Sequence, residues 1–230
     1  MDAMRTGASP VQRSVDWPGC QNVRDLGGLP VGAGQTRWGR LYRSDSLFRL
    51  TAAGRAAVRA AGVSLVVDLR EGPLQEAQPH PFRAAGTGPR VVALPLVPPG
   101  FPFPIPLEGG YCALLGAAAA ADRVRPIVRA IAEESGPIVF HCHSGAGRTG
   151  TLAAVLLAAV GVTAEAIAED FLASMSAEHF AADQIGLAAN VAPQLLDHLD
   201  TAYGGAVAYL RSAGVADADL DRLRRRLVPW

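Results

Sequence analysis

The sequence has 230 residues and a formal net charge of zero, from 21 arginines and 21 acidic residues with no lysine. Half of the residues are apolar, but no run approaches the roughly 20 uncharged residues that span a bilayer, and the first thirty residues lack the apolar core of a secretory signal. This composition predicts a soluble, cytoplasmic protein and argues against a nucleic-acid partner or integral membrane association, while the oligomeric state stays open.

The first part of the chain contains two predicted strands and a helix. Residues 1–13 are polar with Gly, Ser and Pro, so we expect a flexible leader there. Arg37–Tyr42 and Val63–Leu69 are typical of strands, and the apolar run in the second suits burial on both faces of a sheet. Between them, Thr51 can cap an alanine-rich helix that Gly62 ends.

Strands and helices continue to alternate in the second part. Val91–Leu96 and Pro137–His141 are predicted strands, Arg123–Glu134 and Thr149–Val160 are predicted helices, and the chain is helical in character beyond Thr163. This alternation implies crossover connections and parallel strands. We therefore predict a single α/β domain with a central, mostly parallel sheet flanked by helices.

A proline-rich segment, residues 95–106, interrupts this alternation. It contains six prolines with Phe101, Phe103 and Ile105 between them. Proline fixes φ and removes a backbone donor, so the segment is predicted to be a stiff, apolar loop. Two interpretations stay open: a loop that lies over the functional site, or a surface excursion that packs on its own domain.

The three cysteines, Cys20, Cys112 and Cys142, are too few and too scattered for a disulfide framework, and none has the paired spacing of a zinc site. In a reducing compartment, a lone cysteine with suitable neighbours is a candidate nucleophile. The neighbours of each cysteine therefore decide its role.

The neighbours of Cys142 are the most informative. Residues 140–150 read Phe-His-Cys-His-Ser-Gly-Ala-Gly-Arg-Thr-Gly, which leaves a buried type of strand, crosses a short loop and enters an apolar helix. Glycines let successive N–H groups turn inward around an anion, and the helix N-terminus adds its positive dipole end. Arg148, six residues after Cys142, can contact two phosphate oxygens at once. This pattern predicts a phosphate site with a stabilised Cys142 thiolate as nucleophile.

We expect the loop itself to provide the phosphate contacts. Its residues form one continuous run: His143, Ser144, Gly145, Ala146, Gly147 and Arg148.

The loop resembles the His-Cys-x5-Arg-Ser/Thr signature of cysteine-dependent protein tyrosine phosphatases. Four further motifs resemble the bacterial tyrosine phosphatase family to which a mycobacterial phosphatase of dual lipid and protein specificity belongs: residues 22–28 (Asn-Val-Arg-Asp-Leu-Gly-Gly), 41–44 (Leu-Tyr-Arg-Ser), 67–70 (Val-Asp-Leu-Arg) and 170–172 (Asp-Phe-Leu). The resemblance covers nearly the whole chain and implies a phosphatase domain over residues 14–230, with the anion loop between a central strand and a helix.

The resemblance implies a two-step hydrolysis of phosphomonoesters without metal or cofactor. Cys142 would attack phosphorus, an acid would protonate the leaving oxygen, and water would then cleave the phosphocysteine. Thr149 would hydrogen-bond the sulfur, and His141 would hold the shape of the loop. Asp68, the aspartate of the Asp-Leu-Arg motif at the end of a predicted strand, is the expected acid.

Other polar residues of these motifs have expected supporting roles. Asp25, Asp45 and Asp170 are predicted to lie behind the site, and His143, at the mouth of the loop, is an alternative acid.

The expected substrate is phosphotyrosine in a protein, and the alternative is a small phosphorylated metabolite such as a sugar, a nucleotide or a biosynthetic intermediate. Many members of the family read Lys-Asp before the catalytic arginine, where this chain has Ala146-Gly147. Loss of that lysine argues against polyphosphorylated lipid. A rhodanese-like sulfurtransferase and a non-catalytic phosphate-binding module are less favoured functions, because Arg148 and Thr149 accompany the cysteine.

Overall fold

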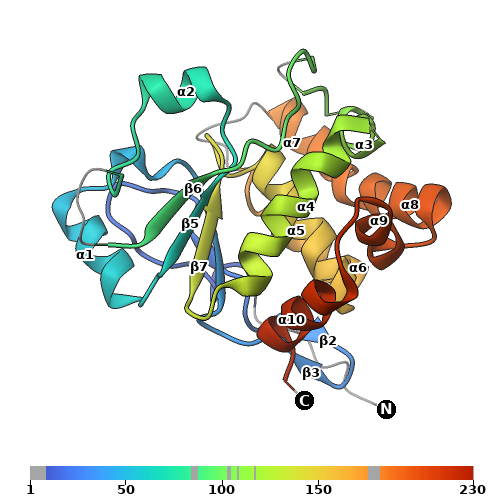
Figure 1. Ribbon diagram of the computed structural model, residues 1–230, viewed down its shortest axis with the longest axis horizontal. Coiled ribbons are helices and arrows are strands. Elements are labelled where there is room, and N and C mark those ends of the chain that lie inside the picture. Colours follow the sequence, from blue (N-terminus) through green and yellow to red (C-terminus); the bar gives the residue numbers. More distant parts are fainter. Residues whose placement is uncertain are drawn as a thin grey trace.

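A five-stranded sheet with the order β1-β4-β7-β5-β6 forms the centre of the protein (Figure 1). The computed structural model describes residues 9–83, 88–102, 105–107, 109–116, 118–175 and 182–229. Strand β1 pairs antiparallel with β4, and the other pairs are parallel. The strands of this sheet are β1 (Arg24–Asp25), β4 (Leu41–Ser44), β5 (Leu65–Asp68), β6 (Arg90–Ala93) and β7 (Ile138–His141). The predicted α/β class with a mostly parallel sheet is confirmed.

Strands β2 (Pro30–Val31) and β3 (Gly34–Gln35) form a separate small ribbon. The helices are η1 (Leu47–Arg49), α1 (Ala52–Ala60), α2 (Gly72–Ala77), α3 (Gly110–Gly116), α4 (Ala118–Glu133), α5 (Gly147–Val160), α6 (Ala164–Leu172), α7 (Ala182–Ala188), α8 (Val191–Tyr203), α9 (Ala206–Ser212) and α10 (Asp217–Leu227). Thr51 caps α1 as predicted, since its hydroxyl accepts a hydrogen bond from the Gly54 N–H at 3.1 Å.

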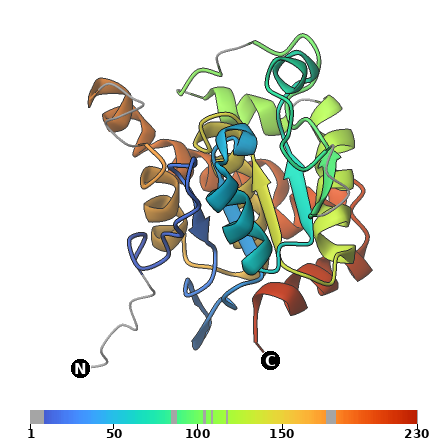
Figure 2. The same ribbon diagram turned by 90° about the vertical axis from the view of Figure 1, so that its left-hand side faces the viewer.

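The sheet separates two apolar cores, because successive side chains of a strand point to opposite faces. On β7, Ile138 and Phe140 pack with α4 and α5 in the larger core, whereas Val139 packs with α1 in the smaller one. Figure 2 shows α1 in front of the sheet, on the opposite side from most of the C-terminal helices. Burial of β7 on both faces explains its continuous apolar sequence.

All four predicted strands are present with somewhat different bounds, and the differences are largest for two of them. The first begins at Leu41 instead of Arg37, because Gly39 turns with a φ of +67° and its N–H bonds Asp25 at 2.7 Å. Strand β6 runs over Arg90–Ala93 and ends before the predicted Leu96, since Pro95 cannot continue the ladder.

The expected leader and the proline-rich segment lie partly outside the described residues, which omit residues 1–8 and 103–104. Arg13, within the expected leader, is buried and pairs with Asp170 at 2.8 Å. This residue is therefore part of the packed domain. In the proline-rich segment, Leu96, Val97 and Ile105 belong to the larger core. Leu107, directly after it, packs against a small apolar cluster that contains Ala146 of the anion loop. Among the described residues, no helix has the length and apolar content to cross a membrane.

Candidate active site

The predicted anion loop connects the central strand to the longest apolar helix. All four residues of β7 are buried, Cys142 follows at its carboxyl end, and α5 begins at Gly147. Open parallel sheets place their sites at this edge. Arg148 and Thr149 lie in the first turn of α5, where backbone N–H groups lack partners within the helix.

The loop carbonyls are fixed by hydrogen bonds from the surrounding framework. The carbonyl oxygen of His143 accepts from the Ser46 N–H at 2.8 Å, and that of Ser144 accepts from Asn22 Nδ2 at 2.9 Å. The third, on Gly145, accepts from Arg43 Nη2 at 2.7 Å. With three successive carbonyls engaged in this way, N–H groups of the loop can turn toward an anion on its other side, although the Ala146 N–H also contacts Ser144 Oγ at 3.4 Å.

Gly145 is required by a close approach to strand β4. Its φ is +73°, and a Cβ there would lie 2.6 Å from the Asp45 nitrogen and 2.7 Å from the Ser44 carbonyl. Only glycine therefore lets the loop lie against the end of β4.

Cys142 and Arg148 are buried together, with exposed fractions of 1% and 5%. The Arg148 guanidinium pairs with the carboxylate of Glu71, the residue before α2. Cys142 and Glu71 raise the pKa of Arg148 against the opposing effect of its burial, so this guanidinium stays cationic. Thr149 Oγ1 is buried and has no hydrogen-bond partner among the described residues.

His141 is completely buried beneath the loop. Its Nδ1 lies 2.9 Å from the carbonyl oxygen of Cys142, and its Nε2 lies 3.8 Å from Asp68 Oδ1. Burial lowers the pKa of His141, although the charge of Asp68 opposes this. A neutral imidazole with its proton on Nδ1 can donate to that carbonyl and hold the start of the loop.

Asp68 ends strand β5 beside β7, where its register partner is His141. Both of its carboxylate oxygens accept from Arg70, at 2.9 and 2.7 Å, and Arg70 also donates to Ser46 Oγ at 3.0 Å. Burial raises the pKa of Asp68, but the hydrogen bonds and charge of Arg70 outweigh it, so the pKa is lowered. This environment favours the ionised carboxylate.

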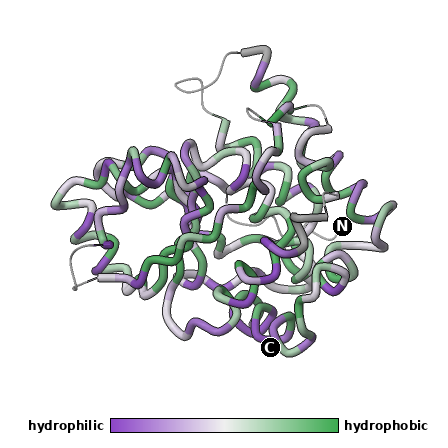
Figure 3. The backbone as a smooth tube through the Cα atoms, turned by 45° about the horizontal axis from the view of Figure 1, so that its top comes forward, coloured by the Kyte–Doolittle hydropathy of each residue, from purple (hydrophilic) through white to green (hydrophobic). Residues whose placement is uncertain are grey.

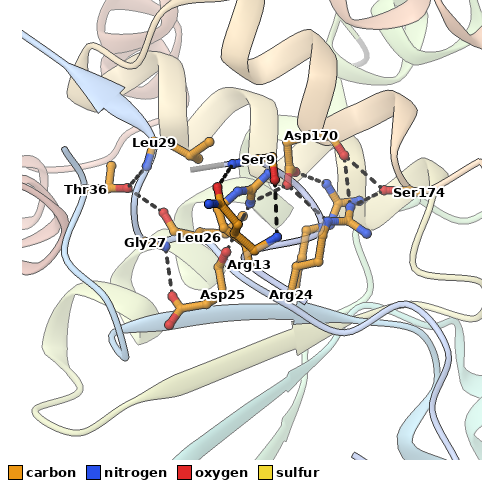
Figure 4. A network of polar contacts seen from close by, with 12 residues as sticks. Ser9, Arg13, Arg24, Asp25, Leu26, Gly27, Leu29, Thr36, Asp170 and Ser174 are labelled. Atoms are coloured by element: carbon orange, nitrogen blue, oxygen red, sulfur yellow. Dashed lines mark hydrogen bonds and ion pairs between the residues drawn. The ribbon is translucent and has the colours of Figure 1, made fainter. Parts of the chain in front are cut away.

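The three other aspartates accept hydrogen bonds that hold together the segments around the loop. Asp25 accepts from the N–H groups of Gly27 and Gly39, and Asp45 accepts from those of Gln21 and Asn22. Asp170 is surrounded by guanidiniums from three separate parts of the chain; two of these arginines, Arg13 and Arg24, lie around it in Figure 4, and the third is Arg43. Because Arg43 also holds the Gly145 carbonyl, Asp170 supports the loop through it.

His143 lies beside a cavity of about 120 Å³ at the mouth of the loop. Burial lowers the pKa of His143, and the positive charges of Arg148 and Arg49 lower it further, so the ring is neutral. Phe48 and Arg49 form another wall of the cavity, with the guanidinium 5.2 Å from the centre of the ring.

Besides Phe48 and Arg49, two further residues of this site were not predicted from the sequence. Glu71 follows the Asp-Leu-Arg motif directly, and its position one residue beyond Arg70 is the only signal for it. Tyr111 lies over the start of α5, where a Cβ on Gly147 would meet its hydroxyl at 2.2 Å. Burial raises the pKa of Tyr111 to about 12, and the nearby Cys142 contributes to this rise.

Comparisons with known proteins show which family the chain belongs to. The amino-acid sequence is 26% identical to the triple specificity protein phosphatase PtpB of Mycobacterium tuberculosis, over 90% of this chain and 96% of PtpB. It is 29% identical to a tyrosine-protein phosphatase of Nostoc commune, over 80% of this chain and 73% of that protein. The crystal structure of TpbA from P. aeruginosa aligns with a TM-score of 0.46 and 18% identity, over 83% of this chain and 91% of TpbA. The model of the tyrosine phosphatase family matches residues 15–229, so the chain belongs to this family of cysteine-dependent phosphatases.

Proposed function

We propose that this phosphatase removes phosphate from phosphotyrosine in proteins through a phosphocysteine intermediate. The observation that carries the proposal is the convergence of Cys142, Arg148 and the N-terminus of α5 on one loop whose carbonyls are engaged elsewhere. Such an arrangement stabilises both a thiolate and the oxygens of a transferring phosphoryl group.

In the first step, the Cys142 thiolate attacks phosphorus and the bond from phosphorus to the leaving oxygen breaks. Arg148 and the loop N–H groups of residues 143–147 hold the three remaining phosphoryl oxygens. The leaving oxygen takes a proton from a general acid, for which Asp68 is the proposed residue. Covalent catalysis divides one difficult displacement into two easier ones.

In the second step, water attacks the phosphocysteine, the phosphorus–sulfur bond breaks, and phosphate and the thiolate are released. The Thr149 hydroxyl, which has no partner among the described residues, is available to donate to the departing sulfur. Glu71 holds the Arg148 guanidinium in place in the absence of phosphate, and we propose it as a positioning residue.

The cavity at the mouth of the loop supports an aryl leaving group. Phe48 and Arg49 provide an aromatic and a cationic wall next to His143, which suits a tyrosyl ring with acidic flanking residues. The relatives named tyrosine or triple specificity phosphatases support a protein substrate as well.

We expect Cys142→Ser to reduce hydrolysis of p-nitrophenyl phosphate by about 10³-fold or more, because serine is not ionised at neutral pH. Cys112→Ser, at a partly exposed thiol on α3, is the matched control and should retain activity. Near-normal activity in Cys142→Ser would exclude this cysteine as the nucleophile.

The substrate is tested by kcat/KM on phosphotyrosyl peptides, phosphoseryl peptides, phosphoinositides, and sugar and nucleotide monophosphates. Phosphotyrosyl peptides should give the highest values. A preference for one of the small metabolites would replace the proposed substrate but leave the mechanism in place.

A further inference from the structure

A second cavity, of about 250 Å³, lies at the opposite end of the sheet from Cys142. It is lined mainly by arginines, two before strand β4 and three on helix α10: Arg37, Arg40, Arg222, Arg225 and Arg226. Glu134 and Ser135, which precede β7, complete the polar wall. Strand β7 lies between this cavity and the anion loop, and at roughly 3.3 Å per residue its length is about 13 Å. In Figure 1, α10 lies below the sheet and the arrow of β7 points away from it.

Neighbouring carboxylates balance only part of the positive charge of this cavity. Arg222 pairs with Asp219 at 2.7 Å, and Glu134 is engaged by Arg90 at 3.3 Å. The remaining four arginines form no ion pair with any residue that the structure describes. Figure 3 shows hydrophilic residues in the chain near the C-terminus.

Arg226 is held with its guanidinium at the wall of the cavity. Its Nη1 donates to the Gly136 carbonyl at 2.8 Å, while its buried Nε has no hydrogen-bond partner among the described residues. Burial lowers the pKa of Arg226, Glu134 counteracts this, and the neighbouring charge of Arg40 lowers it further. Arg40 and Arg226 therefore repel one another, and an anion between them would relieve this repulsion.

We propose that this cavity binds a soluble anion with two or more linked phosphate groups, such as a diphosphate or triphosphate moiety. Guanidinium groups match phosphate oxygens in pairs, and several arginines around one small cavity suit a compact polyanion. A long nucleic acid would need an extended basic surface, whereas the net charge of this chain is zero. The site is separate from the phosphatase loop and does not depend on the proposed substrate.

The test is titration of the wild-type chain with sodium tripolyphosphate by calorimetry, together with hydrogen–deuterium exchange. We expect two binding sites, with slower exchange in residues 142–148 and also in residues 222–228. Arg40→Glu combined with Arg225→Glu should weaken the second site by about tenfold or more, because it replaces two cations with two anions. Phosphorus NMR checks that the probe stays intact.

The control pair is Arg125→Glu with Arg211→Glu, which makes the same change of charge at exposed arginines outside the cavity. It should leave the second site unchanged. Hydrolysis of p-nitrophenyl phosphate should be normal in both double variants and shows that they fold. If the reversal variant does not fold, Arg40→Gln with Arg225→Gln provides a milder test, with a smaller loss of affinity expected.

Three results would overturn the proposal. One is protection by tripolyphosphate confined to residues 142–148. Another is equal affinity in the wild type and in either variant of the cavity. The third is binding to phosphatidylserine vesicles without binding of tripolyphosphate, which would identify the face as a membrane-binding surface instead.

Discussion

Asp68 lies in an environment that favours its ionised form, whereas a general acid must carry a proton. The side chain is 1% exposed, and both oxygens are engaged by Arg70. The pKa of Asp68 is lowered, since these hydrogen bonds outweigh the effect of burial. Only a small fraction of Asp68 is protonated at neutral pH, so an acid role should produce a kcat that rises as the pH falls.

We predict that Asp68→Asn lowers kcat for alkyl phosphates by about 10²–10⁴-fold, which is the usual contribution of general acid catalysis. Aryl phosphates should be affected less, because an aryl oxide leaves without full protonation. The variant should also lose the rise of kcat toward acid pH, which pH profiles on both substrates measure. Asp45→Asn, another carboxylate close to the loop, should retain the profile. An equal loss on both substrates with an unchanged profile would show that Asp68 only positions Arg70, and Glu71 would become the candidate donor.

The elements around the site could be predicted because each is specified by its own sequence. Strands β5 and β7 are apolar runs, and α5 is an apolar helix that ends at Gly161 with a φ of +89°. The start of β4 could not be predicted, because it depends on the contact of Gly39 with Asp25, fourteen residues away. Glu71 and Tyr111 reach the loop only through tertiary packing, and no local pattern marks such contacts.

The close contact between the loop and strand β4 leads to a prediction about Gly145. We expect Gly145→Ala to lower stability by more than the roughly 1–2 kcal/mol that a left-handed conformation costs, because the added methyl group also meets the backbone of Ser44. It should also lower kcat/KM by about tenfold or more, since the loop must move away from Arg43. Gly32→Ala is the matched control: its φ is +54° and nothing lies within 4 Å of the added Cβ. Equal stability and normal kcat/KM in both variants would contradict this interpretation.

Across the whole molecule, zero net charge conceals a strongly uneven distribution. Arginines gather in the cavity beside α10 and around Asp170, where one carboxylate faces three guanidiniums. The network around Asp170 joins the N-terminal segment, strand β1 and helix α6 (Figure 4), and Arg43 adds strand β4 to it. The sequence could indicate Asp170 as a motif residue, but the three partners come from positions more than 120 residues away.

We predict that Asp170→Asn destabilises the protein by about 3–5 kcal/mol at neutral pH, because it leaves buried guanidiniums without a counter-charge. Burial alone would raise the pKa of Asp170, but the three arginines lower it far below its ordinary value of 3.8. A carboxylate with a lowered folded pKa contributes its stability above the unfolded value and loses it as the pH falls through the folded one. The difference between wild type and variant, measured by urea unfolding, should therefore be largest above about pH 5 and shrink below about pH 4. Asp122→Asn, which breaks the exposed pair with Arg125, should cost less than about 0.5 kcal/mol at every pH. A constant difference for Asp170→Asn across this range would mean that the side chain acts through packing and hydrogen bonds instead of its charge.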